Sequence, residues 1–453
     1  MKKKLITALC VLFWLALWQV GAMLLRQEIL LVSPIQAVCR LAELVPTADF
    51  LRSVGFSTGR IMAGFGLGLV SGTMLALLAG KVRFVKTLLS PLVSAVKAVP
   101  VASITVLALI WVSSRNLSVL VSFLISLPIV YSNMLEGIES LDPKLREMAE
   151  VFHVPALRRA AGVYLSQLLP YFRAAVRLAV GLSWKSGAAA EIIGIPSGSI
   201  GEKLYEAKIY LETADLFAWT IAVILLSWLS EKLLLLLVNA AAKAVSAMVD
   251  RQTFPGDQAA VPAGITVRRL TKRYGENTVL DGFSCVIPAG ELTAVAGVSG
   301  CGKTTLLSLL TGLLDPDSGE VLTDPPGARF SAVFQEDRLC ENLTVSANIR
   351  LANSGLSGAE ISEALSAVGL SGCENRTVRE LSGGMKRRTA LLRALLAEYG
   401  AVVLDEPFKG LDEATKNQVL DFCREKLRGK TAVLVTHDIS EAESLGASQI
   451  IRL

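Results

Sequence analysis

The sequence predicts a chain of two unlike parts, an N-terminal all-α membrane domain that crosses the bilayer several times and a C-terminal α/β domain. Three observations predict this division. Hydrophobic residues make up 52% of the 453 residues, a high fraction for a soluble protein. All six Trp lie between Trp14 and Trp228. Charged residues are sparse before about Val238 and frequent after Asp250, where long apolar runs give way to strands alternating with helices.

The division falls in a polar stretch of the chain. We place the membrane domain at 1–245, a linker at 246–263 and the α/β domain at 264–453. A helix needs about 20 apolar residues to cross a bilayer, and the sequence before the linker predicts about six such helices. The expected spans are 5–25, 57–80, 87–112, 117–137, 168–194 and 214–240.

Basic residues predict which side of the membrane the α/β domain faces. Lys and Arg favour the cytosolic side, and here they gather before the first span, between the second and third, and between the fourth and fifth. With six spans, these segments share one side with the α/β domain, so we expect a multi-pass plasma-membrane protein whose α/β domain is cytoplasmic. The net charge of +5 follows from this topology and gives no reason to expect nucleic acid as a partner.

A nucleotide-binding motif follows the first strand of the α/β domain's core. The stretch ELTAVAGVSGCGKTTLLSLL (291–310) predicts a strand, a glycine-rich loop and a helix, which is typical of a P-loop NTPase. The loop N–H groups and the helix N-terminus bind phosphates, the lysine reaches the β/γ-phosphates, and the next hydroxyl ligates Mg²⁺. We expect ATP to contact Gly297, Val298, Ser299, Gly300, Cys301, Gly302, Lys303, Thr304 and Thr305, with Thr304 also on Mg²⁺.

Polar residues at the ends of two later strands predict the hydrolytic groups. AVVLDEP (401–407) places Asp405 and Glu406 at the carboxyl end of a buried strand, where open α/β sheets bind ligands. We expect Asp405 to hold Mg²⁺ and Glu406 to orient or deprotonate an attacking water. TAVLVTHD (431–438) ends on His437, placed to contact a γ-phosphate. The blander alternatives are a solvated acidic turn and a structural histidine.

The order of these motifs resembles that of ATP-binding cassette (ABC) ATPases. LSGG (381–384) stands between the P-loop and D-E-P, and the resemblance covers nearly all of 264–453. The family implies that two such domains close head-to-tail, the P-loop of one facing the LSGG of the other, hence a homodimer. Met385 stands where Gln is commonest in the signature. The resemblance implies an adenine-stacking Tyr274, a Gln335 that reaches Mg²⁺ and senses the transmembrane partner, ATP binding in trans by Ser382, Gly383 and Gly384, and a D-loop Asp412.

An amphipathic stretch between the fourth and fifth spans resembles the EAA loop of ABC importer permeases. The resemblance covers about 145–170 and implies a coupling helix that docks on the ATPase near Gln335. Glu147, Met148 and Ala149 stand at the E-A-A positions, and His153 occupies the usual Gly. The alternative is a surface linker. Helical spacing on either side of a bend at Pro155 puts these residues on one side: Leu145, Met148, Ala149, Phe152 and Leu157.

The membrane half also resembles permeases of the nitrate/sulfonate/taurine importer group, in stretches such as GLSWKSGAAAEIIG (181–194). Together the resemblances imply ATP-driven import of a small solute of that group, an organic anion or a vitamin precursor, supplied by a separate extracellular or periplasmic binding protein. The alternatives are an ABC exporter, which would need long cytosolic helices, and a membrane-anchored ATPase acting on a partner protein, which would need a large extracellular domain. Lys97, Lys185 and Glu191 are candidates for lining an anion path, with snorkelling or internal pairing as the alternative.

Overall fold

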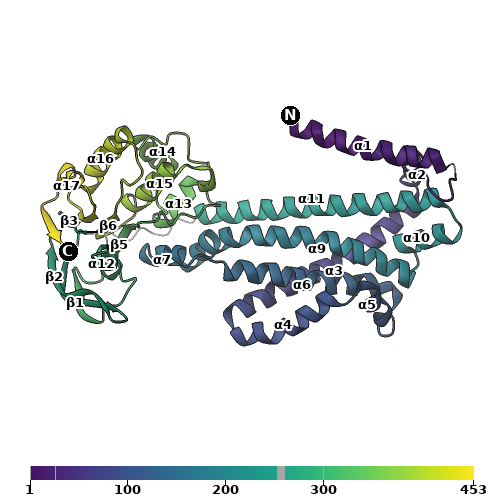
Figure 1. The fold of residues 1–453 in the computed structure, drawn as a ribbon, viewed down its shortest axis with the longest axis horizontal. Coiled ribbons are helices and arrows are strands. Elements are labelled where there is room, and N and C mark those ends of the chain that lie inside the picture. Colours follow the sequence, from purple (N-terminus) through teal and green to yellow (C-terminus); the bar gives the residue numbers. More distant parts are fainter. Residues whose placement is uncertain (1, 26, 252–260, 299) are drawn as a thin grey trace. The chain divides into compact units, whose positions relative to one another are not determined.

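Two compact units make up the chain. The computed structural model describes residues 2–25, 27–251, 261–298 and 300–453 (Figure 1). The first, here called the helical unit, comprises Met1–Ser140 and Leu168–Ala241, and the second, the sheet unit, comprises Leu141–Gln167 and Ala242–Leu453. The expected linker at 246–263 lies partly outside the described residues, at 252–260, as does Ser299 of the P-loop.

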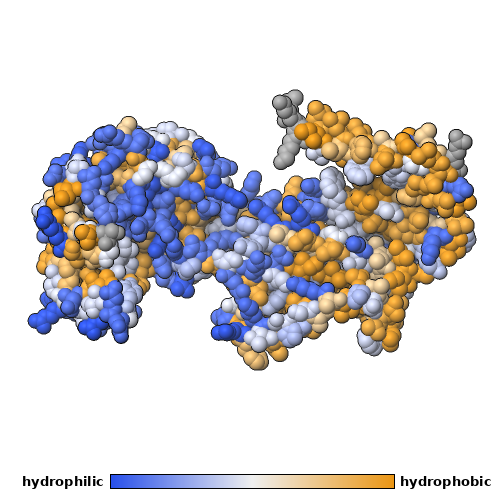
Figure 2. Space-filling model, viewed as in Figure 1, coloured by the Kyte–Doolittle hydropathy of each residue, from blue (hydrophilic) through white to orange (hydrophobic). Residues whose placement is uncertain are grey.

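The described residues of the helical unit form helices and the turns between them. Their bounds are α1 Lys2–Leu25, α2 Pro34–Leu44, α3 Ala48–Lys81, α4 Arg83–Ala98, α5 Val101–Ala108, α6 Ser114–Glu139, α9 Leu165–Gly194, α10 Ile200–Ile209 and α11 Thr213–Arg251. The first residues of α9 and the last of α11 belong to the sheet unit. Figure 2 shows hydrophobic residues over most of the visible surface of the helical unit, as expected for helices that face lipid.

The number of spans differs from the six that were expected. Within the described residues, four helices are long and apolar enough to cross a membrane, namely α1, α3, α6 and α11. The expected span 87–112 is broken: α4 and α5 meet at a bend of 98° and count as at most one span. Pro100 explains the break, since it lacks an N–H and forces Val99 into an extended conformation. The expected span 168–194 lies within helix α9, but α9 is not among the four helices that are long and apolar enough to cross a membrane.

Glycines allow α3 and α6 to pack closely. A Cβ added to Gly64 would collide with the carbonyl of Val119, and one added to Gly68 would collide with the Ser126 side chain. Such close approach of small residues stabilises helix pairs in lipid, where packing replaces the hydrophobic effect. Gly64 and Gly68 therefore have a structural role in this helix pair.

The sheet unit holds two sheets. The antiparallel one has the order β2-β1-β4, and the parallel one has the order β5-β6-β7-β3-β8. The strands are β1 Gly264–Tyr274, β2 Asn277–Ile287, β3 Leu292–Ala296, β4 Ser318–Asp324, β5 Phe330–Val333, β6 Ala401–Asp405, β7 Thr431–Val435 and β8 Gln449–Arg452. The larger helices are α12 Lys303–Leu310, α13 Val345–Ala352, α14 Gly358–Ala367, α15 Gly383–Leu395, α16 Glu413–Leu427 and α17 Ile439–Ser444. Every residue of β6 and β7 is buried, which is typical of central parallel strands.

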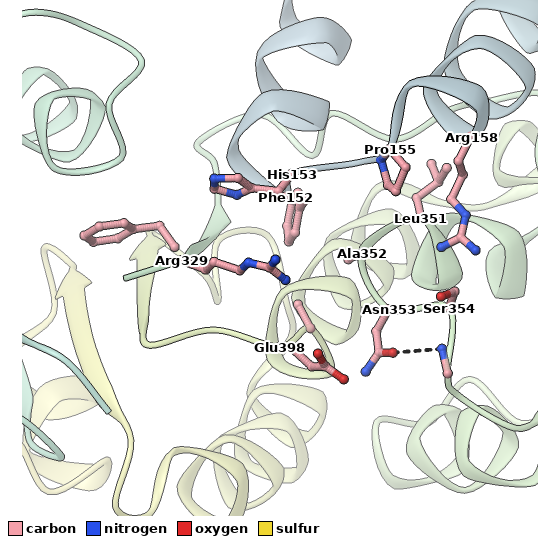
Figure 3. Close-up of a pocket in the computed structure, with 13 residues that line it drawn as sticks. Phe152, His153, Pro155, Arg158, Arg329, Leu351, Ala352, Asn353, Ser354 and Glu398 are labelled. Atoms are coloured by element: carbon pink, nitrogen blue, oxygen red, sulfur yellow. Dashed lines mark hydrogen bonds between the residues drawn. The ribbon is translucent and has the colours of Figure 1, made fainter. Parts of the chain in front are cut away.

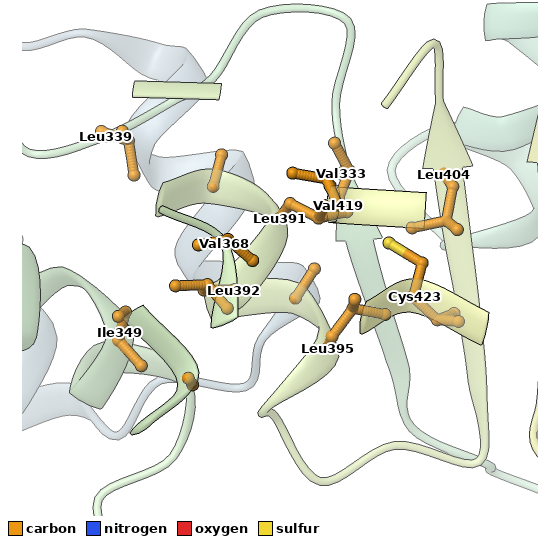
Figure 4. Packing of buried hydrophobic residues seen from close by; sticks show 14 of the residues in the cluster. Val333, Leu339, Ile349, Val368, Leu391, Leu392, Leu395, Leu404, Val419 and Cys423 are labelled. Atoms are coloured by element: carbon orange, nitrogen blue, oxygen red, sulfur yellow. The ribbon is translucent and has the colours of Figure 1, made fainter. Parts of the chain in front are cut away.

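A hydrophobic core joins the parallel sheet to α13, α15 and α16. Figure 4 shows Val333, Leu391, Leu404, Val419 and Cys423 packed together from these elements. The loop 141–167 contributes to the same core through α7 (Pro143–Val151).

That loop continues through a one-turn helix, α8 (Ala156–Arg158), and a π-helical segment (Arg159–Tyr164). The expected apolar side is buried at Leu145, Met148, Ala149 and Phe152. The expectation for Leu157 is wrong, because its side chain is 71% exposed. The chain turns at Pro155 before α8 begins, so α8 does not continue the face of α7.

Candidate functional site

The glycine-rich loop lies between β3 and α12, where the sequence predicts phosphate binding. Gly300 and Gly302 adopt φ angles of +84° and +100°, which glycine accommodates without strain. Lys303 begins α12 and is buried, and its Nζ donates to the carbonyls of Gly297 at 2.7 Å and Val298 at 2.8 Å. The ammonium therefore already points into the loop where phosphate oxygens would bind.

Asp405 and Thr304 meet at the end of β6. The Thr304 hydroxyl donates to Asp405 Oδ2 at 3.3 Å, and burial raises the pKa of Asp405. Gln335 lines the same cavity of about 100 Å³ as these two residues. The structure thus gathers the three expected Mg²⁺ ligands.

The three side chains fit Mg²⁺ by their chemistry. They offer a carboxylate, a hydroxyl and an amide oxygen, and Mg²⁺ prefers oxygen ligands that it shares with phosphates and water. In the described part of the chain, no group of three or more His, Cys, Asp or Glu could hold a metal alone.

Glu406 follows Asp405, and its carboxylate contacts the side chains of Lys409 and His437. Its Oε1 lies 2.7 Å from Nε2 of His437, and its Oε2 accepts from Nζ of Lys409 at 3.0 Å. Burial alone would raise the pKa of Glu406, but the bonds from Lys409 and His437 outweigh it, and the pKa lies below its usual value. His437 lies in the loop after β7, which ends at Val435 and not at His437 itself. Lys409 was missed by the sequence analysis; its position three residues after Glu406 was the available signal.

The signature residues begin α15. Ser382 caps the helix by accepting a hydrogen bond from the N–H of Met385 at 3.4 Å, and Gly383 has open space where a Cβ would stand. Asp412 caps α16 in the same way, accepting from the N–H of Thr415 at 3.0 Å. Tyr274, at the end of β1, is 50% exposed, as an adenine-stacking side chain would have to be before nucleotide binds.

The loop 141–167 is held to the rest of the sheet unit by burial and by charge. Met148 is fully buried in the core, and Glu147 Oε2 lies 2.9 Å from Nη1 of Arg338. Lys144 Nζ donates to both oxygens of Glu336, at 2.6 and 2.8 Å. Glu336 follows Gln335 directly, so the loop reaches the segment where docking was expected. Lys144 and Arg338 were missed, since pairs nearly 200 residues apart leave no local signal.

His153 ends α7 in a left-handed conformation, with a φ of +49°. That conformation is uncommon outside glycine, and it accounts for the turn at the position where the resemblance expects Gly. Phe152, His153 and Pro155 line a cavity of about 270 Å³ together with Arg329 and residues of α13. Figure 3 shows this cavity beside the docked loop.

The candidate path residues of the helical unit fall into two classes. Glu191 is fully buried and accepts hydrogen bonds from the Ser57 hydroxyl at 2.6 Å and the Gly201 N–H at 3.4 Å. It therefore fastens α9 to α3 and to the start of α10, the internal pairing named as the alternative. Lys97 and Lys185 are exposed, and Lys97 donates to Ser132 at 2.7 Å.

Comparison with known proteins matches both parts of the chain. Residues 280–409 match the family described as "ABC transporter", and residues 68–247 match "Binding-protein-dependent transport system inner membrane component". The aliphatic sulfonates import ATP-binding protein SsuB 1 of Rhizobium johnstonii is 40% identical over 213 residues, which are 44% of this chain and 78% of that protein. SsuB 1 of Nocardia farcinica is 42% identical over 194 residues, 42% of this chain and 78% of its own. The thiamine import ATP-binding protein ThiQ of Chelativorans sp. is 40% identical over 179 residues, 36% of this chain and 73% of its own.

Proposed function

Because the chain belongs to the ABC transporters and joins an import-type permease to an ATPase, we propose that it imports a small solute as a homodimer, with a separate extracellular binding protein delivering that solute. The chain is a multi-pass membrane protein with a cytoplasmic ATPase domain, and it couples ATP hydrolysis to transport. The observation that most supports import is the docked loop, in which Met148 is buried and Glu147 pairs with Arg338.

In the proposed hydrolytic site, Lys303 and the loop around it bind the β/γ-phosphates, and Tyr274 stacks on adenine. Thr304, Asp405 and Gln335 would hold Mg²⁺, which would neutralise charge on the phosphate oxygens. Glu406 orients the attacking water and accepts its proton, while His437 contacts the γ-phosphate. The short His437–Glu406 distance of 2.7 Å supports this assignment, since it puts both groups at one place.

The position of the signature supports the proposed homodimer. Ser382, Gly383 and Gly384 begin α15, whereas the P-loop precedes α12, so the family's head-to-tail arrangement needs a second chain to complete each ATP site. Asp412, at the start of α16, would contact the partner as the D-loop aspartate.

The solute that we propose belongs to the nitrate/sulfonate/taurine-like group. The permease stretches that resemble this group and the identity with two sulfonate-import ATPases support it. A vitamin precursor is the second candidate, favoured by the similarity to a thiamine-import ATPase.

The test is ATP turnover by the purified protein in liposomes, beside Glu406→Gln, with and without a liganded extracellular binding protein from the same source. We expect a low basal rate that rises only with the binding protein, and the stimulating ligand then identifies the solute. Glu406→Gln should still bind ATP and lose about 10²- to 10⁴-fold in turnover. A high rate unchanged by the binding protein would favour export or action on a partner protein instead.

A further inference from the structure

Two arginines of α15 point into the sheet unit and not into solvent. Arg387 is 4% exposed and Arg393 is 0% exposed. Burying a guanidinium is costly unless hydrogen bonds satisfy it. The hydrogen-bond partners of these two side chains therefore indicate their function.

Arg387 joins two segments of the proposed hydrolytic site. Its Nη1 donates to the carbonyl of Phe334 at 2.6 Å and lies 3.1 Å from the carboxylate of Asp337. Its Nη2 donates to the carbonyls of Asp405 at 2.5 Å and Glu406 at 2.6 Å. One side chain therefore holds the segment around Gln335 against the turn that carries the proposed base.

The backbone of Glu406 needs such support. Its φ is +46°, in the left-handed region, and a non-glycine residue there persists only when its surroundings hold it. The N–H of Glu406 donates to the Val435 carbonyl at 2.9 Å, and its own carbonyl accepts from Arg387. Arg387 thus fixes the conformation that aims the Glu406 carboxylate at His437.

Arg393 extends the connection to the docked loop. Its Nη1 donates to the carbonyl of Arg338 at 2.7 Å and its Nη2 to that of Asp337 at 3.1 Å. Its guanidinium lies 5.1 Å from the ring centre of Phe152, a cation–π contact. The side chain of Arg338 pairs with Glu147 of the same loop. Asp337 is therefore shared: its carbonyl bonds Arg393, and its carboxylate bonds Arg387.

We propose that Arg387 and Arg393 are positioning residues that carry the docked state of the coupling loop, through Asp337, to the backbone of Glu406. This connection is separate from the one that the sequence predicts through the side chain of Gln335. It rests on the proposed function, because it assumes that Glu406 acts in hydrolysis. A planar guanidinium is required at both positions, since lysine offers a single point charge where Arg387 spans several carbonyls.

The first experiment measures ATP turnover and ATP binding by the full-length protein in liposomes with Mg²⁺, using Arg387→Lys, Arg387→Gln and Asp337→Asn. We expect kcat to fall roughly ten- to hundredfold, with KM for ATP and the affinity for a fluorescent ATP analogue within about twofold of the parent protein. Lys386→Gln is the matched control, because Lys386 is the neighbouring basic residue on α15 and pairs with Glu341 at the surface. This variant should leave kcat unchanged.

The second experiment combines Phe152→Leu, Arg393→Lys and Arg387→Lys in double-mutant cycles. If the residues form one connection, each double variant has the kcat of its more impaired single variant. Multiplying effects, or unchanged kcat in all three variants at positions 387 and 337, would overturn the proposal. So would losses of kcat and ATP affinity that run parallel to a loss of thermal stability, since that pattern indicates a merely structural role. Glu406→Gln, measured beside them, separates the two hypotheses: normal turnover there refutes the proposed function itself, whereas an inactive Glu406→Gln with a normal Arg387→Lys refutes this inference alone.

Discussion

At the scale of single residues, the proposed base is defined by its partners more than by its place in the motif. The order D-E after a buried strand predicts both carboxylates. In the structure, their pKa values are shifted in opposite directions. Burial raises the pKa of Asp405, whereas the bonds from Lys409 and His437 lower that of Glu406 against the effect of burial. The spacing of three residues between Glu406 and Lys409 is a signal for one of these contacts, but no local sequence pattern specifies the left-handed φ of Glu406.

Lys409→Met should move the acid limb of the kcat–pH profile to higher pH. Lys409 lowers the pKa of Glu406, so its removal raises that pKa, and the carboxylate takes up a proton at a higher pH than before. ATP turnover measured between pH 5 and 9 at low salt would show the shift, and high salt should reduce the difference because Lys409 is 62% exposed. Lys426→Met, which removes a surface pair with Glu425, is the control. An acid limb that stays in place would mean that Glu406 does not control the profile.

At the scale of elements, the coupling loop shows what periodicity can predict. The spacing of apolar residues is right for α7, where four expected positions are buried, and wrong for Leu157, because the chain turns at Pro155 before α8 begins. The same limit applies to the expected span 87–112, in which hydropathy is continuous but the helix bends by 98° at Pro100. The ion pairs that seat the loop join residues nearly 200 positions apart, so only the folded chain identifies them.

Charge reversal at the loop should distinguish ATP hydrolysis itself from its stimulation by the binding protein. Glu147→Arg places two cations together at Arg338, and Arg338→Glu places two anions together. Each should abolish the rise in ATP turnover that the binding protein causes, while ATP binding persists. The double reversal restores an opposite pair and should recover most of the stimulation. Recovery is the decisive outcome, since a second substitution would not reverse simple unfolding. Arg424→Glu, remote from the loop and paired with Asp421, should have no effect.

Glycine spacing on α3 gives a second prediction at this scale. Gly68→Ala adds a Cβ that collides with the Ser126 side chain of α6, whereas Gly66→Ala adds one with nothing within 4 Å. We expect Gly68→Ala to lower the thermal stability of the detergent-purified protein and its yield in the membrane. Gly66→Ala should be neutral or stabilising by up to about 1 kcal/mol, because alanine favours helix. Equal behaviour of the two variants would contradict the close packing of α3 on α6.

At the scale of the whole molecule, composition alone separates the two parts, because bilayer and cytosol demand different residues. Motif order predicts the nucleotide-binding fold equally well, since the P-loop, the signature and the D-E-P turn each lie at the end or start of one element. What composition does not predict is that 141–167 packs with the sheet unit. Met148 and its neighbours make this loop part of the core of the sheet unit, so the proposed coupling contact lies within one folded body.

Complementation between two inactive chains tests whether the ATP sites are shared. Lys303→Ala removes the phosphate-binding lysine, and Gly383→Asp adds a carboxylate at the signature, where a Cβ meets open space and the fold should persist. In a head-to-tail homodimer, mixing the two variants leaves one site in each mixed dimer with an intact P-loop and an intact signature. Each mixed dimer has one intact site of its two, so about half of the sites should be intact in a preparation that holds mixed dimers alone. The two chains would be co-expressed with different tags and purified through both tags, which retains only mixed dimers. ATP turnover of this preparation would measure the fraction of intact sites. If each site lay within one chain, every site would carry one of the two defects, and no mixture would exceed the activity of the variants alone.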